Sequence, residues 1–196
     1  MIALEPEILL PGHGFPIYGK ERIQEALSTT SKFLKTIETQ TVQLMNKGKS
    51  LNEIIHTVKI PDELIKLPWL RPVYDDPEFL IRMIWRRYGG WWDGEYDRLL
   101  PAKRNEESKV WIELVGGLEK VIDKALEMSS QGKDKIAAHL IETAFYADET
   151  NESVHKARKA IYEKFSMKQD SSMARNILNH ASLASAQNKR DLAEKD

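Results

Sequence analysis

The longest helix signal in the chain lies at residues 20–48, KERIQEALSTTSKFLKTIETQTVQLMNKG, which contains no proline and no glycine before Gly48. Its apolar residues, among them Ile23, Leu27 and Ile37, recur near the 3.6-residue spacing of one helix face. Gly48 predicts the end of this helix, because glycine readily adopts the left-handed conformation of a C-cap. The pattern predicts one long amphipathic helix and favours a mainly α-helical fold.

The next segment carries three short helix signals. Ser50–Glu53 has the spacing of a capping box, which predicts a helix over residues 51–58. A brief helical turn is predicted at 62–66, between two prolines. Asp76-Pro77 reads as an N-cap followed by proline at the first helical position, so a further helix is predicted over 77–88, before Gly89-Gly90.

The second half of the chain has the pattern of four helices, predicted at residues 106–130, 134–147, 152–165 and 171–186. Alanines within them favour close helix–helix packing. Helices alternating with short breaks are typical of tetratricopeptide-like helical hairpins, of which about one and a half units would fit. One alternative is therefore a non-catalytic helical module that binds other proteins.

Composition narrows the class of protein. The 196 residues are 41% hydrophobic and 30% charged, which indicates a soluble globular chain, and the formal net charge of −1 argues against nucleic acid as a partner. The absence of cysteine excludes disulfides and thiolate metal sites, and fits a cytoplasmic location. No apolar run approaches the roughly 18 residues of a membrane-spanning helix, and the start lacks the basic region of a signal peptide.

A glycine-rich loop near the start carries the first chemical candidate. Ile8-Leu9-Leu10 predicts a buried strand, although the rest of the chain offers almost no other strand. His13 follows it between Gly12 and Gly14, in a setting that can present an imidazole to a metal ion. A catalytic zinc needs about three protein ligands, so His13 is either one member of a metal site or a turn residue without a role.

The remaining histidines, His56, His139, His155 and His180, lie on predicted helices without metal-ligand spacing, and we expect structural roles for them. RRYGGWWDG, residues 86–94, predicts either a packed corner between helices or an aromatic platform for a ligand. The packed corner is the favoured interpretation, and it predicts that Trp91 is buried.

Several segments in order resemble a known family. PEILLPGHGFPIYG (6–19) resembles the last metal-ligand loop of the metallo-β-lactamase superfamily. NKGKSLNEIIHTVKIPDEL, YGGWWDG, AAHLIETAFYADETN and SSMARNIL resemble its alkyl sulfatase branch, the last two the helical dimerisation domain. Arg82 and Tyr88 match an arginine and a tyrosine of that branch, with roles open between substrate binding and packing, whereas Glu78-Phe79-Leu80 departs from its more polar pattern.

The resemblance implies an architecture and a site. Residues 1–48 would be the last part of an αββα metallo-β-lactamase sandwich and 49–186 a helical dimerisation domain. Independently of the resemblance, residues 187–196 are predicted to be a frayed tail, as chain ends often are. His13 would be the final ligand of a two-zinc centre that activates water to cleave an ester, above all a sulfate ester. The other ligands would lie outside this chain, which alone should be inactive. The implied partner is a second copy in a homodimer, with no nucleic acid and no membrane.

Overall fold

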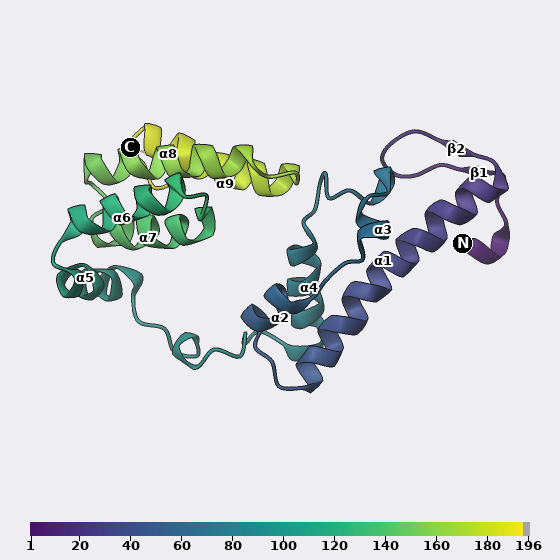
Figure 1. The fold of residues 1–196 in the computed structure, drawn as a ribbon, viewed down its shortest axis with the longest axis horizontal. Helices are drawn as coiled ribbons and strands as arrows, with labels where there is room; N and C mark the ends of the chain where they lie inside the picture. The colour runs from purple at the N-terminus through teal and green to yellow at the C-terminus, as the bar shows by residue number, and fades with distance from the viewer. Residues whose placement is uncertain (194–196) are drawn as a thin grey trace. The chain divides into compact units, whose positions relative to one another are not determined.

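The computed structural model describes residues 1–193, and these form two compact units that are treated separately below. Unit 1 comprises residues 1–72 and 76–99, and unit 2 comprises residues 73–75 and the chain from residue 100 onward. Within the described residues there are nine α-helices and one two-stranded sheet, which confirms the predicted mainly α fold (Figure 1). The domain division predicted at residues 48–49 stays a prediction.

Unit 1 is built on one long helix. Its elements are β1 (Ile8–Leu9), β2 (Ile17–Tyr18), α1 (Lys20–Asn46), α2 (Leu51–Thr57), α3 (Asp62–Ile65) and α4 (Pro77–Gly89), with 3₁₀ turns at Ile2–Leu4, Pro68–Leu70 and Tyr96–Arg98. The predicted long helix is thus confirmed as α1. Packing of α4 and the short helices against α1 encloses an apolar core of Phe33, Ile37, Ile54, Leu64, Leu70 and Ile81.

Both predicted caps in unit 1 are present. The Ser50 hydroxyl accepts the Glu53 N–H at 3.4 Å, and the Glu53 carboxylate accepts the Ser50 N–H at 2.9 Å, which completes the capping box of α2. The Asp76 carboxylate accepts the Glu78 N–H at 2.8 Å, and Pro77 takes the first position of α4. These bonds satisfy N–H groups that have no partner inside a helix.

Unit 2 contains five helices: α5 (Arg104–Val115), α6 (Leu118–Ser130), α7 (Asp134–Ala147), α8 (Glu152–Met167) and α9 (Ser172–Ala186). Consecutive helices from α6 to α9 pack against one another, as helical hairpins do. Their buried faces form one core, with Ile122, Ala125, Ile141, Phe145 and Ile161 among its members. Close packing here follows from the alanines, because small side chains let helix backbones approach.

One predicted helix proved to be two. The sequence pattern favoured a continuous helix over 106–130, whereas the structure ends α5 at Val115 and starts α6 at Leu118. Gly116 and Gly117 between them have φ angles of +85° and +123°. Residues other than glycine rarely adopt such φ angles. This glycine pair therefore permits a sharp turn, which the periodicity of the sequence alone does not reveal.

A short strap from the first half of the sequence belongs to unit 2. The Ser171 hydroxyl accepts the Ala174 N–H at 3.1 Å as the N-cap of α9 and donates to the Tyr74 carbonyl at 2.5 Å. The Ser172 N–H donates to the Val73 carbonyl at 2.9 Å. Residues 73–75 therefore cap α9 although they are about 100 positions away in the sequence.

The described part of the chain ends shortly after α9. The tail predicted from residue 187 to 196 is described as far as residue 193, and residues 194–196 lie outside the described part. Asp191 lies 3.2 Å from the His180 ring on α9 and accepts the Ala193 N–H at 2.8 Å. No helix within residues 1–193 is both long and apolar enough to cross a membrane.

Candidate metal-ligand loop

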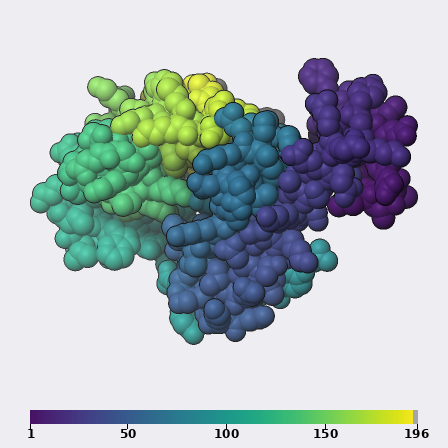
Figure 2. Space-filling model, turned by 45° about the vertical axis from the view of Figure 1, so that its right-hand side comes forward, coloured from purple at the N-terminus to yellow at the C-terminus, as the bar shows by residue number. Residues whose placement is uncertain are grey.

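The predicted loop around His13 is the turn of a small hairpin. β1 pairs antiparallel with β2, with Ile8 opposite Tyr18 and Leu9 opposite Ile17, and the Gly19 N–H donates to the Glu7 carbonyl at 3.0 Å. The sequence pattern missed β2, because two residues between Pro16 and Gly19 are too short for a strand signal. The hairpin forms the dark purple end of unit 1 in Figure 2.

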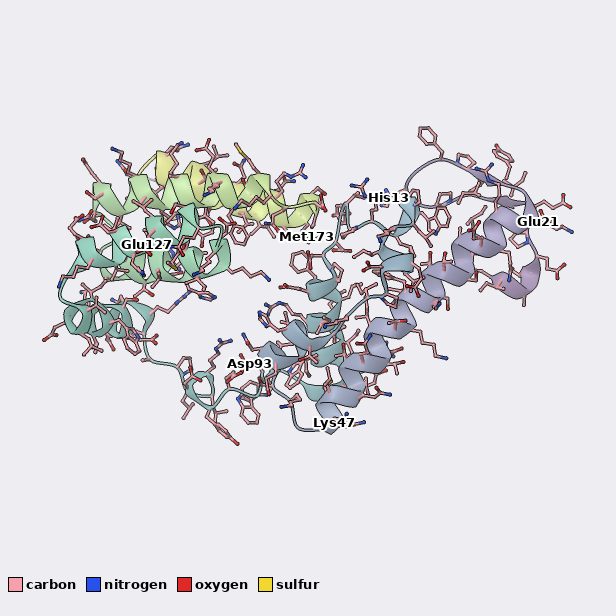
Figure 3. The ribbon with its side chains drawn as sticks, in the orientation of Figure 1. His13, Glu21, Lys47, Asp93, Glu127 and Met173 are labelled. Atoms are coloured by element: carbon pink, nitrogen blue, oxygen red, sulfur yellow. The ribbon has the colours of Figure 1, made fainter. Side chains whose placement is uncertain are left out.

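His13 lies on the loop that joins the two strands (Figure 3). Its side chain is exposed, and Gly14 beside it has a φ of +91°, which glycine adopts without strain. No three His, Asp or Glu side chains in residues 1–193 come together as a metal-binding group. The described residues therefore supply one imidazole and do not fit a complete zinc centre, which needs about three protein ligands.

The other four histidines are spread over both units. His56 Nδ1 lies 2.8 Å from the Asn52 carbonyl in α2, and His180 lies beside Asp191. His155 is buried, with Nε2 2.9 Å from the Glu149 carbonyl and its ring edge-on to Phe145. His139 is exposed on α7. His56, His155 and His180 thus make local contacts within their own units, and the structural role expected for the four histidines stays a prediction.

The aromatic corner predicted at residues 86–94 packs only in part, because residues 86–91 are exposed and its hydrogen bonds also use Trp85 and Glu95. Trp85 Nε1 donates to the Trp92 carbonyl at 2.8 Å, and Trp92 Nε1 donates to the Glu95 carbonyl at 3.0 Å. The Asp93 carbonyl accepts the Leu51 N–H at 2.9 Å, which ties the corner to the start of α2. Each of these hydrogen bonds holds an indole ring or a backbone carbonyl in place, so the bonded part of the corner has a structural role within unit 1.

The prediction that Trp91 is buried was wrong. Its side chain is 78% exposed, whereas Trp85 and Trp92 are half-buried. The reason lies in the turn that follows α4: Gly90 has a φ of +85° and breaks the helical direction. The chain then returns with Trp92 toward Trp85, which leaves Trp91 on the outside.

Arg82 and Tyr88, the other residues suggested by the resemblance, lie exposed on α4. The Tyr88 hydroxyl donates to Glu38 on α1 at 2.8 Å, and this hydrogen bond raises the pKa of Tyr88. Beside this pair, α1 and α4 form a shallow depression of about 240 Å³. It is lined by Leu34, Ile37, Glu38, Leu80, Met83, Ile84 and Arg87.

Sequence reasoning missed a buried polar cluster in unit 2. Arg158 on α8 donates to Glu142 on α7 at 2.6 Å and to Ser185 on α9 at 2.8 Å. Its guanidinium also lies over the rings of Phe145 and Tyr162. The sequence did contain a signal for this cluster. Arg158 is four residues from Val154 and three from Ile161, so a charged residue lies on the apolar face of the predicted helix.

Comparison with known proteins gives consistent matches. The family model described as alkyl sulfatase dimerisation matches residues 50–188. A linear primary-alkylsulfatase of a Pseudomonas sp. strain is 33% identical over 147 residues, covering 74% of this chain and 28% of that protein. The alkyl/aryl-sulfatase BDS1 of Saccharomyces cerevisiae is 27% identical over 153 residues, covering 78% of this chain and 23% of that protein.

A solved structure matches as well. The stereoselective inverting sec-alkylsulfatase Pisa1 from Pseudomonas sp. aligns with a TM-score of 0.87 at 24% identity, over 93% of this chain and 29% of that one. This likeness establishes the fold. The chain spans about a quarter of the length of the curated relatives it matches. Because the family model covers well over half of its residues, the chain belongs to the alkyl sulfatase dimerisation family.

Proposed function

We propose that this chain works as a section of an alkyl-sulfatase-type hydrolase, in which it supplies homodimer contacts and one metal-ligand histidine. The observation that carries the proposal is the match of residues 50–188 to the dimerisation family. That stretch includes α2 to α9, so these helices are the elements to which we assign the dimer contacts.

The metal role is assigned to His13 alone. It is exposed at a glycine-flanked turn, where its imidazole is open to partners that the described residues do not provide. A neutral imidazole is a common zinc ligand, and the proposed metal is zinc. Because a single ligand neither holds a zinc ion tightly nor lowers the pKa of its water, we expect no hydrolysis from this chain by itself.

The proposed substrate class of the complete enzyme is alkyl sulfate esters. Support comes from the names of the relatives, which are primary, secondary and alkyl/aryl sulfatases. Within this chain, Arg82 is an exposed guanidinium on α4, and such a group can pair with a sulfate oxygen. The alternative of a separate tetratricopeptide-like adaptor is the weaker proposal, because the matched family is a dimerisation domain of an enzyme family.

The dimer is tested directly by light scattering coupled to size-exclusion chromatography. The full 196-residue chain at tens of micromolar should elute as one species with twice the mass of the 22.6 kDa chain. A monomeric peak at that concentration would overturn the proposed function. A polydisperse peak would also count against it, because non-specific association through exposed apolar surface has no fixed stoichiometry.

A further inference from the structure

The depression between α1 and α4 in unit 1 has a mostly apolar lining. Ile37 of α1 is fully buried, and Leu80 and Ile84 of α4 are half-buried. Leu34 and Met83 complete the apolar lining and are 47% and 58% exposed. On each helix these side chains are three or four residues apart, so they lie on one helix face. The volume of about 240 Å³ is below the roughly 300–1,000 Å³ of sites for drug-sized ligands, so the depression suits a small apolar molecule.

Two opposite charges also line the depression, Glu38 on α1 and Arg87 on α4. The Tyr88 hydroxyl donates to Glu38 Oε1 at 2.8 Å, and a carboxylate can accept further hydrogen bonds beside this one. The Arg87 guanidinium lies 5.6 Å from the centre of the Tyr88 ring and carries several N–H donors. The lining therefore offers both an acceptor and a donor, and their charges cancel.

This pair of charges discriminates between the headgroups of apolar ligands. An anionic headgroup would be attracted by Arg87 and repelled by Glu38, and a cationic headgroup would experience the reverse. A hydroxyl carries no charge and can donate to Glu38 while it accepts from Arg87. Because hydrogen bonds to charged groups are stronger than those between neutral groups, the pair fits a neutral headgroup that both donates and accepts.

We propose that the depression between α1 and α4 binds an aliphatic alcohol, with its chain on the apolar lining and its hydroxyl between Glu38 and Arg87. The proposal goes beyond the proposed function, in which this depression has no role. Hydrolysis of an alkyl sulfate ester releases an alcohol of this class, so the ligand is compatible with that function. The fit of a hydroxyl to the two charges does not depend on it, and a failure to bind alcohol would leave the homodimer and the assignment of His13 standing.

The experiment compares 1-octanol, octyl sulfate and octyltrimethylammonium, each added to the full chain below the concentration at which micelles form. The NMR shifts of the Ile84 methyl groups report binding at the depression itself and give the dissociation constants. 1-Octanol should bind at one site per chain, about 10-fold or more tightly than either charged probe. From butanol to octanol the affinity should rise by up to about fourfold per methylene, which corresponds to about 0.8 kcal/mol per buried CH₂.

A substitution within the apolar lining tests the position of the chain. Met83→Glu places a charge in the lining and should weaken the binding of 1-octanol by about 10-fold or more. Met167→Glu is the matched control, because Met167 is an exposed methionine (73%) on α8, and it should change the dissociation constant by less than about twofold. Far-UV circular dichroism checks that each variant is folded, and Leu34→Glu replaces Met83→Glu if that variant does not fold.

Substitution of the two charged residues tests the position of the hydroxyl. Glu38→Gln leaves the positive charge and should shift the preference toward octyl sulfate, whereas Arg87→Gln leaves the negative charge and should shift it toward octyltrimethylammonium. Octyl sulfate that binds the wild type as tightly as 1-octanol would overturn the proposal. Equal losses in Met83→Glu and Met167→Glu would also overturn it, as would an Ile84 that responds to none of the probes, which would leave a protein segment as the occupant.

Discussion

Arg158 on α8 and Glu142 on α7 form an ion pair inside unit 2, with 2.6 Å between Arg158 Nε and Glu142 Oε1. The two side chains are only 8% and 17% exposed. The same guanidinium donates to the Ala181 carbonyl and the Ser185 hydroxyl of α9. One cation thus connects three consecutive helices of the dimerisation family's fold.

Replacing Arg158 should lower the free energy of unfolding substantially. Arg158→Met leaves the Glu142 carboxylate buried without its partner, and breaking a buried pair in this way costs about 3–5 kcal/mol. Lys124→Met is the matched control, because the Lys124–Glu127 pair is about half exposed and should contribute about 1 kcal/mol or less. Urea unfolding followed by circular dichroism measures both, and equal losses would contradict the structural role of Arg158.

The raised pKa of Tyr162 predicts that the protein loses stability at alkaline pH. Burial raises the pKa of its hydroxyl above the ordinary value of about 10, and the nearby Glu142 carboxylate raises it further. Above pH 10 the unfolded chain releases this proton while the folded chain keeps it, so the free energy of unfolding falls as the pH rises. The stabilisation is complete below pH 10.

The measurement is urea unfolding between about pH 8 and 11.5. The contribution of Tyr162 should decline by up to about 1.4 kcal/mol per pH unit above pH 10. Tyr162→Phe keeps the ring and removes the proton, so its stability should decline less steeply over the same range. Parallel curves for the wild type and the variant would show that the hydroxyl is not held neutral by its surroundings.

Two tryptophans of the aromatic corner should respond differently to truncation. Trp85 packs on the core of unit 1 and donates to the Trp92 carbonyl, so Trp85→Ala should cost about 3 kcal/mol or more. Trp91 is mostly exposed, so Trp91→Ala should stay within about 0.5 kcal/mol of wild type. Thermal unfolding of both variants checks this contrast, and a large loss for Trp91→Ala would restore the original prediction of a buried ring.

Zinc should not remain bound to this chain. After dialysis against a weak chelator we expect less than stoichiometric metal, because the described residues bring no three ligands together. Release of sulfate from an alkyl sulfate should be undetectable as well. Retention of one zinc per chain that is lost in His13→Ala and kept in His180→Ala would contradict this expectation, since both histidines are exposed.

Local chemistry determined which parts of the fold were predictable. The starts of α2 and α4 followed from Ser50, Glu53 and Asp76, because capping depends on residues adjacent in sequence. The turn at Gly116-Gly117 was missed, because glycines also occur inside periodic segments and only their φ angles distinguish the two cases. The cap that Tyr74 provides to α9 depends on a contact across 97 positions, which no local pattern reports.

The candidate site was predictable only in part, for a similar reason. Two glycines around His13 indicated an exposed loop, and the structure has one there. The exposure of Trp91 depended on the direction in which the chain leaves Gly90, and residue type alone favoured burial. The Arg158 cluster needed three helices to be in place before its partners could be identified.

The mass of the chain in solution tests the account most directly. Light scattering of the 196-residue protein at tens of micromolar should give a single species of twice 22.6 kDa. A wild-type protein that has the mass of one chain at that concentration would contradict the assignment of these helices to a homodimer.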